Sequence, residues 1–557
     1  MGTKRRALIH LLMAGLITGC GAGGMREVLD LWQRQQAQID SGQLQGAWAD
    51  AQAGVAVFRG VPYAAPPVGD NRFRPPAPAG SWAGVRSALD FGTACWQDFS
   101  PNGFVWSRTD FARSEDCLYL NVWSAASAVD ERRPVMVWFH GGSHTSGYGH
   151  SKLFDGTALA RAGVVLVSVN YRLGPFGFLA HPALAAESAS STSGNYGLMD
   201  KVAALQWVAR NAHAFGGDAN NVTIFGQSAG SSSVCYLMAS AKARGLFHKA
   251  IGQSASCMAH HVDETDARGL IRGEALVASA IGADSSTKPT VDAATLRSLS
   301  PLQLLRGAQQ TGWANRSRVV IDGDFINAPP RDTFAAGKHN AVPLIVGSMA
   351  NEDVELFPLN DALTPGAFVQ QVNQRYSEQA PDLLAAYSKA LARSPGHAAR
   401  AMVMDRFITW EMRTWARFNA AAGQPTFLYF FEHAPPAFRI YQPHNPSLGP
   451  EHGLKGSARS AGAYHSGDLA YVFHSLNQFE LDWSPRDIEI ADELSGYWAK
   501  FAASANPNGA GRPDWPDYEP EQHTTLVIGS RTAAKTGLRK LQLDAFDAAL
   551  LGPSSRR

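Results

Sequence analysis

The feature that most restricts the fold of this chain lies at residues 221–234, which read NVTIFGQSAGSSSV. Four β-prone residues run directly into Gly226-Gln227-Ser228-Ala229-Gly230, and a helix-capable segment of small and apolar residues follows. A turn this sharp between a buried strand and a helix needs small residues around the serine, and its strained backbone exposes the serine hydroxyl. The pattern predicts a nucleophile elbow at Ser228. The alternative is a structural serine in a Gly/Ser-rich turn, which would have a similar sequence.

Short apolar segments and helix-like segments alternate along the body of the chain. Strands are expected at residues 133–139, 164–169 and 222–225, with a helix at 200–212. This alternation predicts an α/β protein with a mostly parallel sheet. Residues 364–421 are rich in helical signals and are expected to cap one end of the sheet. No linker divides the body into two domains.

The N-terminal residues predict export. Three basic residues at positions 4–6 precede a short apolar run that stops at Cys20, which is typical of a signal peptide and too short for a spanning helix. Residues 17–20, ITGC, resemble the lipoprotein box, whose cysteine is lipidated. We therefore expect a signal peptide at 1–19 and a bacterial periplasmic or outer-membrane lipoprotein anchored through Cys20, or else a secreted protein with an incidental cysteine.

Beyond the signal peptide, residues 20–45 are expected to form a spacer, with a helix at 25–40, ahead of a single catalytic domain at 46–545. The helix is predicted from apolar residues at positions 25, 28, 29 and 32.

The charge balance and the cysteines exclude several classes of function. With 49 basic and 48 acidic residues, the chain has no net field that would attract nucleic acid. A small or neutral molecule is the expected partner. Four cysteines remain after Cys20, and export permits disulfides among them in three pairings. No C-x-x-C pair is present, so no zinc site is predicted.

A serine nucleophile needs a general base and an acid that orients it, and in this motif both follow the serine in the chain. Glu352, Asp353 and Glu355 follow a strand-like run that turns at Gly347. Histidines stand at positions 433, 444, 452, 465 and 474. Spacing alone does not choose among these candidates.

The residues FHGGSH at 139–144 follow a predicted strand and resemble the HGGG-type loop of oxyanion holes. Backbone N–H groups placed in such a loop stabilise the negative charge that develops on the substrate oxygen. The alternatives are an ordinary glycine turn, or a metal site at His140 and His144. The glycines and the lack of a nearby acidic ligand disfavour metal.

Landmarks across residues 45–530 resemble, in order, those of the type-B carboxylesterases, a family that includes the cholinesterases. They are FRGVPYAAPPVGDNRFRPP (58–76), EDCLYLNVW (115–123), VMVWFHGG (135–142), VNYRLGPFGFL (169–179), NYGLMDKVAALQWVARNAHAFGGDANNVTIFGQSAG (195–230), VIDGDF (320–325), GSMANED (347–353), GAYHSGDLAYVF (462–473) and FAASANPN (501–508). The resemblance implies the α/β-hydrolase fold, with a large mostly parallel sheet, flanking helices and helical cap insertions.

The same resemblance assigns roles to individual residues. It implies Ser228 as nucleophile, Glu352 as acid and His465 as base. The oxyanion hole would consist of the N–H groups of Gly142, Ser143 and Ala229. The implied disulfides are Cys95–Cys117 and, from position, Cys235–Cys257, and the implied structural ion pairs are Arg72–Glu115 and Arg172–Asp200.

Several positions depart from the family pattern. Ser143 replaces the third oxyanion glycine, and Asn351-Glu352-Asp353 replaces the usual D-E-G, which leaves Asp353 as a rival acid. Gln227 stands where cholinesterases place Glu, which disfavours cationic choline esters. Aromatic side chains between Cys95 and Cys117 either line an entrance or pack that loop, and they are Phe99, Phe104, Trp106 and Phe111.

The predicted function is a serine carboxylesterase that hydrolyses neutral small-molecule esters through an acyl-enzyme intermediate. No metal or organic cofactor is needed. The alternatives are a non-catalytic binding or adhesion protein of the same fold and a serine hydrolase that acts on amides. The sequence leaves the oligomeric state open.

Overall fold

The computed structural model describes residues 35–98, 111–258, 266–283, 289–313, 318–352, 360, 362–436, 459, 462–479 and 481–551. The predicted signal peptide and Cys20 lie outside the described residues. Within the described ranges, no helix has the length and apolar character needed to cross a bilayer.

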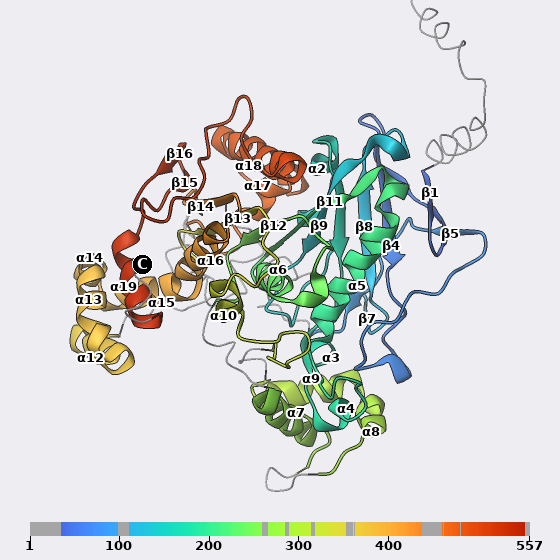
Figure 1. Cartoon of the computed structure of the whole chain (residues 1–557), viewed down its shortest axis with the longest axis horizontal. Coiled ribbons are helices and arrows are strands. Elements are labelled where there is room, and N and C mark those ends of the chain that lie inside the picture. The colour runs from blue at the N-terminus through green and yellow to red at the C-terminus, as the bar shows by residue number, and fades with distance from the viewer. Residues whose placement is uncertain are drawn as a thin grey trace, which may run out of the picture.

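A mixed sheet of eleven strands forms the centre of the described structure, in the order β16-β15-β14-β13-β12-β11-β9-β10-β8-β4-β3 (Figure 1). In chain order the strands are β3 (Ala47–Asp50), β4 (Val55–Pro62), β8 (Tyr119–Ser124), β9 (Arg133–Phe139), β10 (Val165–Val169), β11 (Gly217–Gln227), β12 (Lys249–Gln253), β13 (Leu344–Met349), β14 (Thr426–Phe431), β15 (Thr525–Ile528) and β16 (Thr532–Lys535). In the order of the sheet, the seven neighbouring strands from β15 to β10, which include β9, are parallel to one another. The pairings at the two edges, β15 with β16 on one side and β10 with β8, β8 with β4 and β4 with β3 on the other, are antiparallel. The predicted mostly parallel sheet is confirmed.

Side chains alternate between two hydrophobic layers along the central strands, as the two-residue period of a strand requires. On β9, Val135 and Val137 pack with one layer, whereas Met136 and Trp138 pack with the other. The first layer includes residues of α5 (Tyr196–Asn211), α6 (Ala229–Ala239) and α16 (Trp410–Ala421), and the second includes α18 (Pro485–Ser504). Helices therefore cover both faces, which explains why the parallel strands are buried along most of their length, apart from residues near the start of β9 and β11.

The described part of the N-terminal segment is a strand, so the predicted helix at 25–40 is wrong there. β1 (Gln36–Ile39) pairs with β2 (Gly42–Gln45), which in turn pairs with β5 (Val85–Ser87). Ala37 and Ile39 are buried while Gln38 is exposed, which is an alternation with period two. Residues 36–45 therefore belong to the body and are not a separate spacer.

The helical insertion predicted at 364–421 is confirmed. It comprises α12 (Pro365–Tyr376), α13 (Ala380–Ala386), α14 (Ser388–Arg393), α15 (Pro395–Met404) and α16. Thr364 caps α12 by accepting a hydrogen bond from the N–H of Ala367 at 3.2 Å. Most of these helices share a hydrophobic cluster with α19 (Lys540–Leu550) and lie beyond one edge of the sheet in Figure 1.

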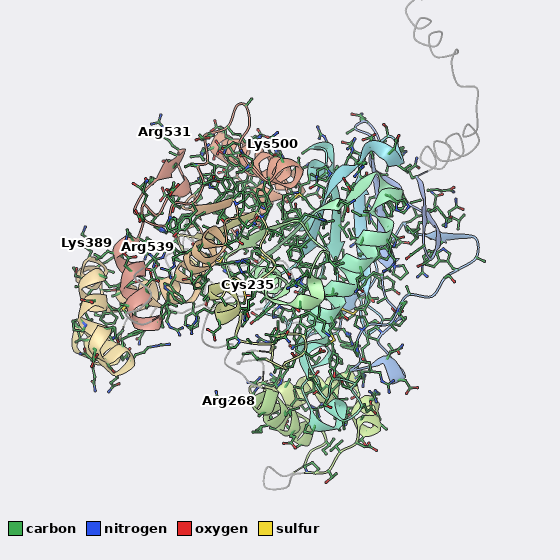
Figure 2. All side chains as sticks on the ribbon, viewed as in Figure 1. Cys235, Arg268, Lys389, Lys500, Arg531 and Arg539 are labelled. Atoms are coloured by element: carbon green, nitrogen blue, oxygen red, sulfur yellow. A yellow bond between two sulfur atoms is a disulfide. The ribbon has the colours of Figure 1, made fainter. Side chains whose placement is uncertain are left out.

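Two disulfides join the four described cysteines, as the family resemblance implied. Cys95 pairs with Cys117 and Cys235 pairs with Cys257. The second disulfide joins α6 to the segment after β12, so it holds the helix that follows Ser228. Figure 2 shows Cys235 in the interior, while the charged side chains of Lys389, Lys500 and Arg531 lie at the periphery.

Candidate active site

Ser228 lies in a strained turn between β11 and α6. Its φ of 56° and ψ of −128° fall in a region that residues with a side chain rarely adopt. Ser228 is partly exposed, whereas residues 222–227 before it and Ala229 and Gly230 after it are buried. The turn thus presents the serine alone at the carboxyl end of β11, as the sequence predicted.

The glycines on both sides of Ser228 allow this close approach of strand and helix. A Cβ atom on Gly226 would lie 2.4 Å from the carbonyl carbon of Gly230, and one on Gly230 would lie 1.9 Å from the carbonyl oxygen of Phe139. The turn is also fixed from the other side, since the N–H of Ser228 donates to the carbonyl of Gln253 on β12 at 2.8 Å.

The loop after β9 lies against the elbow. A Cβ atom on Gly141 would lie 3.1 Å from Cβ of Ser228. The backbone then passes through three residues of positive φ, with 102° at Gly142, 55° at Ser143 and 56° at His144. Among the described residues, none accepts a hydrogen bond from the N–H groups of Gly142, Ser143 or Ala229. Three backbone donors are therefore available around Ser228.

Glu352 and His465 form a buried pair. Nδ1 of His465 contacts Oε2 of Glu352, and both side chains are almost completely shielded from solvent. The other carboxylate oxygen of Glu352 accepts a hydrogen bond from the N–H of Met349 at 2.8 Å. Because Nδ1 is held by the carboxylate, Nε2 is the ring nitrogen left to exchange a proton.

Asn351 holds the segments of Glu352 and His465 together. Its N–H donates to the carbonyl of Ala463 at 2.9 Å, and its side-chain oxygen accepts from the N–H of Ala463 at 3.0 Å. Gly462 lies so close to Asn351 that a Cβ atom there would be 2.2 Å from the side-chain oxygen. The sequence contained no signal for this link, because its two sides are over a hundred residues apart in the chain.

Gln227 joins the nucleophile to the base. Its side-chain amide is fully buried and donates from Nε2 to the carbonyl oxygen of His465 at 2.8 Å. The side chain therefore lies against the backbone of His465. The sequence indicated only that Gln227 disfavours cationic esters, whereas the structure also gives it a positioning contact.

A second buried carboxyl group lies beneath this pair. Asp468 accepts hydrogen bonds at Oδ2 from Nε2 of Gln253, at 2.8 Å, and from the hydroxyl of Tyr429, at 2.9 Å. Burial raises the pKa of Asp468 to about 6, and the charge of Glu352 adds to this increase. Asp468 stood in a family landmark, three residues after His465, but only its buried surroundings distinguish it from a surface carboxylate.

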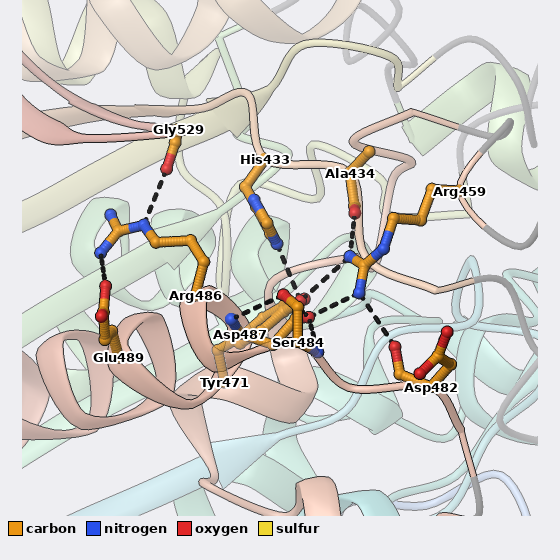
Figure 3. A network of polar contacts seen from close by, with 10 residues as sticks. All are labelled: His433, Ala434, Arg459, Tyr471, Asp482, Ser484, Arg486, Asp487, Glu489 and Gly529. Carbon is orange, nitrogen blue, oxygen red and sulfur yellow. Dashed lines mark hydrogen bonds and ion pairs between the residues drawn. The ribbon is translucent and has the colours of Figure 1, made fainter.

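A hydrogen-bonded network around Asp487 fixes the segments before and after His465 (Figure 3). Asp487 is fully buried and accepts hydrogen bonds from Arg459, at 2.6 Å, and from the hydroxyl of Tyr471, also at 2.6 Å. His433 contacts it at 2.8 Å. Burial alone would raise the pKa of Asp487, but hydrogen bonds from His433, Arg459 and other neighbours hold it far below its usual value.

The structure separates the histidine candidates by their partners. His465 contacts Glu352, whereas His433 contacts Asp487 and the partly exposed His474 contacts Asp492 at 2.8 Å. His444 and His452 lie outside the described residues, as do Asp353 and Glu355. Of the aromatic side chains proposed for the entrance, only Phe111 is described, and it packs against Tyr148. The entrance stays a prediction.

The two ion pairs implied by the family resemblance are present. Arg72 pairs with Glu115, and Arg172 pairs with Asp200 at 2.7 Å with both side chains buried. His140 and His144 have separate hydrogen-bond partners, Gly141 and Ser233. Within the described ranges, no group of three or more potential metal ligands is present.

The elbow, the two-glycine loop and Glu352 follow the parallel strands β11, β9 and β13, so all three lie at the carboxyl edge of the sheet. A strand, sharp serine turn and helix at this edge define the α/β-hydrolase fold. A model of the carboxylesterase family matches residues 33–546. The chain belongs to the carboxylesterase family, and it is accordingly a carboxylic ester hydrolase.

Individual relatives agree with this membership. The chain is 32% identical over 507 residues to the fumonisin B1 esterase of Sphingopyxis macrogoltabida, covering 88% of this chain and 87% of that protein. It is 31% identical over 499 residues to the para-nitrobenzyl esterase of Bacillus subtilis, covering 86% and 92%. The structure of the carboxylesterase EST55 of Geobacillus stearothermophilus superposes with a TM-score of 0.77 at 31% identity, covering 92% of this chain and all of that one.

Proposed function

We propose that the protein hydrolyses neutral carboxylic esters with Ser228 as nucleophile, His465 as general base and Glu352 as the acid that orients it. The oxyanion hole is formed by the N–H groups of Gly142, Ser143 and Ala229. The observation that carries the proposal is the buried contact between Glu352 and Nδ1 of His465, with Gln227 linking the base to the residue before Ser228.

In the first half of the reaction, Nε2 of His465 takes the proton of the Ser228 hydroxyl as its oxygen attacks the ester carbonyl. The carbonyl oxygen becomes negatively charged and accepts hydrogen bonds from the three backbone N–H groups, each typically worth a few kcal/mol in the transition state. His465 then gives its proton to the leaving alcohol, and an acyl-enzyme remains. Water, deprotonated by His465, releases the acid and restores Ser228.

Neutral esters are proposed because position 227, where cholinesterases carry Glu, holds an uncharged amide. Its side chain is buried against the backbone of His465, so it adds no negative charge that would attract a cationic ester. The relatives named above are esterases by their printed names, which supports ester substrates and leaves the acyl and alcohol groups to be measured. A panel of esters that varies each group separately, and that includes a choline ester, tests this. A choline ester preferred over its uncharged isostere would contradict the proposal.

The test of the mechanism is Ser228→Ala. Because the nucleophile is removed, we expect hydrolysis of a para-nitrophenyl ester to fall by several orders of magnitude, as in other serine hydrolases, while circular dichroism stays unchanged. Mass spectrometry of the wild type after reaction with a phosphonate should place the adduct on Ser228. A variant that keeps more than a few per cent of wild-type turnover would refute the assignment.

We also propose that the protein is exported and held at a membrane by lipid on Cys20. Support comes from the basic residues at 4–6, the apolar run after them and the ITGC motif. Several acyl chains at one site are enough for stable anchoring.

A further inference from the structure

His144 lies next to an oxyanion donor, and its side chain joins that donor's loop to the nucleophile helix. Its imidazole is buried, and Nε2 is 2.8 Å from the hydroxyl oxygen of Ser233 on α6. The hydroxyl of Ser233 in turn donates to the carbonyl oxygen of Ala229 at 2.8 Å. Two hydrogen bonds thus connect the residue after Ser143 to the residue that follows Ser228.

The direction of these hydrogen bonds fixes the state of the imidazole. The proton of Ser233 is used toward Ala229, so the hydroxyl oxygen accepts from His144, and Nε2 must carry a proton. Burial, with Lys201 and Arg318 nearby, lowers the pKa of His144 well below its usual value, so the ring is neutral. A neutral ring protonated at Nε2 serves as a fixed donor.

The backbone at this point needs such a support. Ser143 and His144 are consecutive residues with side chains, and both have positive φ. Each such conformation costs on the order of 1 kcal/mol and persists only where surrounding contacts enforce it. The carbonyl of His144 accepts from the N–H of Gly174 at 2.7 Å, and its ring packs on Phe178. The bond to Ser233 is a side-chain contact that joins this loop to α6.

We propose that His144 is a positioning residue that, through Ser233, sets the spacing between the N–H groups of Ser143 and Ala229. These two donors come from separate segments, and both must meet one substrate oxygen. Donors placed before the reaction stabilise the transition state without reorganisation. Loss of the bridge therefore lowers kcat and leaves the ground-state binding of the ester largely unchanged.

Three variants test the bridge. His144→Phe keeps a planar ring and removes the donor, and Ser233→Ala removes the link from the other side. Each is expected to lower kcat about 10- to 100-fold with KM within about twofold, which is less than the loss of a whole oxyanion donor. His144→Gln, whose amide N–H reaches the place of Nε2, should recover at least a third of the lost kcat.

The affinity for a transition-state analogue tests the bridge independently of turnover. The affinity for a trifluoromethyl ketone, which forms a tetrahedral adduct, should fall in proportion to kcat in His144→Phe and Ser233→Ala. The double variant should be no worse than the poorer single variant, because both remove one bridge. His339→Phe is the matched control, since His339 is also buried and faces Asn419 on α16, and its kcat should stay at the wild-type value.

The inference depends on the oxyanion hole proposed above, and the outcomes separate the two. If Ser228→Ala stays active, the proposed mechanism fails and the bridge has no role. If Ser228→Ala is inactive while Ser233→Ala and His144→Phe keep wild-type kcat, only the bridge is refuted. A loss that appears in KM, or that His144→Gln does not recover, also refutes it. Should His144→Phe not fold, Ser233→Ala and the ketone affinity decide.

Discussion

Gly230→Ala is predicted to impair catalysis without adding any polar or charged group. The added Cβ atom would lie 1.9 Å from the carbonyl oxygen of Phe139 and 2.9 Å from that of His140. Cβ atoms essentially never approach other heavy atoms closer than 3.0 Å, so β9 and α6 must separate by the difference between 3.0 and 1.9 Å, about 1.1 Å. Both contacts are backbone atoms, which cannot rotate away as a side chain would.

This displacement would move the nucleophile relative to the oxyanion donors, whose relative positions the reaction constrains most tightly. His140 begins the loop that carries Gly142 and Ser143, and Gly230 lies two residues after Ser228. A misplacement of about 1 Å can cost about 100-fold in rate, and overpacking of this kind destabilises by about 1–3 kcal/mol. We therefore expect kcat for a para-nitrophenyl ester to fall about 100-fold.

The assay should report turnover per folded site. Near-ultraviolet circular dichroism gives the folded fraction, and urea unfolding gives the change in stability. Gly366→Ala is the control, because Gly366 is exposed in the first turn of α12 and nothing lies within 4 Å of an added Cβ atom. It should keep kcat and gain up to about 1 kcal/mol of stability. A Gly230→Ala enzyme that retains kcat within threefold would refute the steric reasoning.

Two further predictions address the parts of the chain that sequence left most open. Glu352→Gln should lower kcat about 10⁴-fold, as an amide fails to hold the imidazole in the required tautomer, while Asp353→Asn stays near the wild type; a reversed result would move the acid role to Asp353. Cys20→Ser should move the exported protein from the membrane fraction to the soluble fraction, measured by detergent phase partition, and an unchanged partition would exclude the lipid anchor.

Local patterns in the sequence were enough to predict the elbow and the strands around it. Strands at 133–139 and 222–225 follow from apolar runs, and the glycines near Ser228 follow from the steric demands of the turn. The helix expected at 200–212 begins earlier, at Tyr196, after Asn195 adopts a left-handed conformation. The helix predicted at 25–40 was wrong at 36–39 because the apolar positions that supported it, 25, 28, 29 and 32, all precede this segment, whose own apolar residues alternate with period two.

The contacts that complete the site could not be predicted from spacing, because they join distant parts of the chain. Glu352 and His465 are 113 residues apart, and Gln227 and His465 are 238 apart. Five histidines had equal claims until the family resemblance selected one and the structure showed its partner. The role of Gln227 depends on which way its amide points, and that direction is set by packing alone.

The network around Asp487 also determines when a growing chain can acquire a complete site. Domains begin to fold from the N-terminal side during synthesis, so β9, β11 and the strained turn at Ser228 leave the ribosome well before His465. His465 is held between Arg459 and Tyr471, whose common partner Asp487 is made later still. The nascent chain should therefore remain inert toward esters until most of it has been translated, which would protect the cell that makes it from premature hydrolysis.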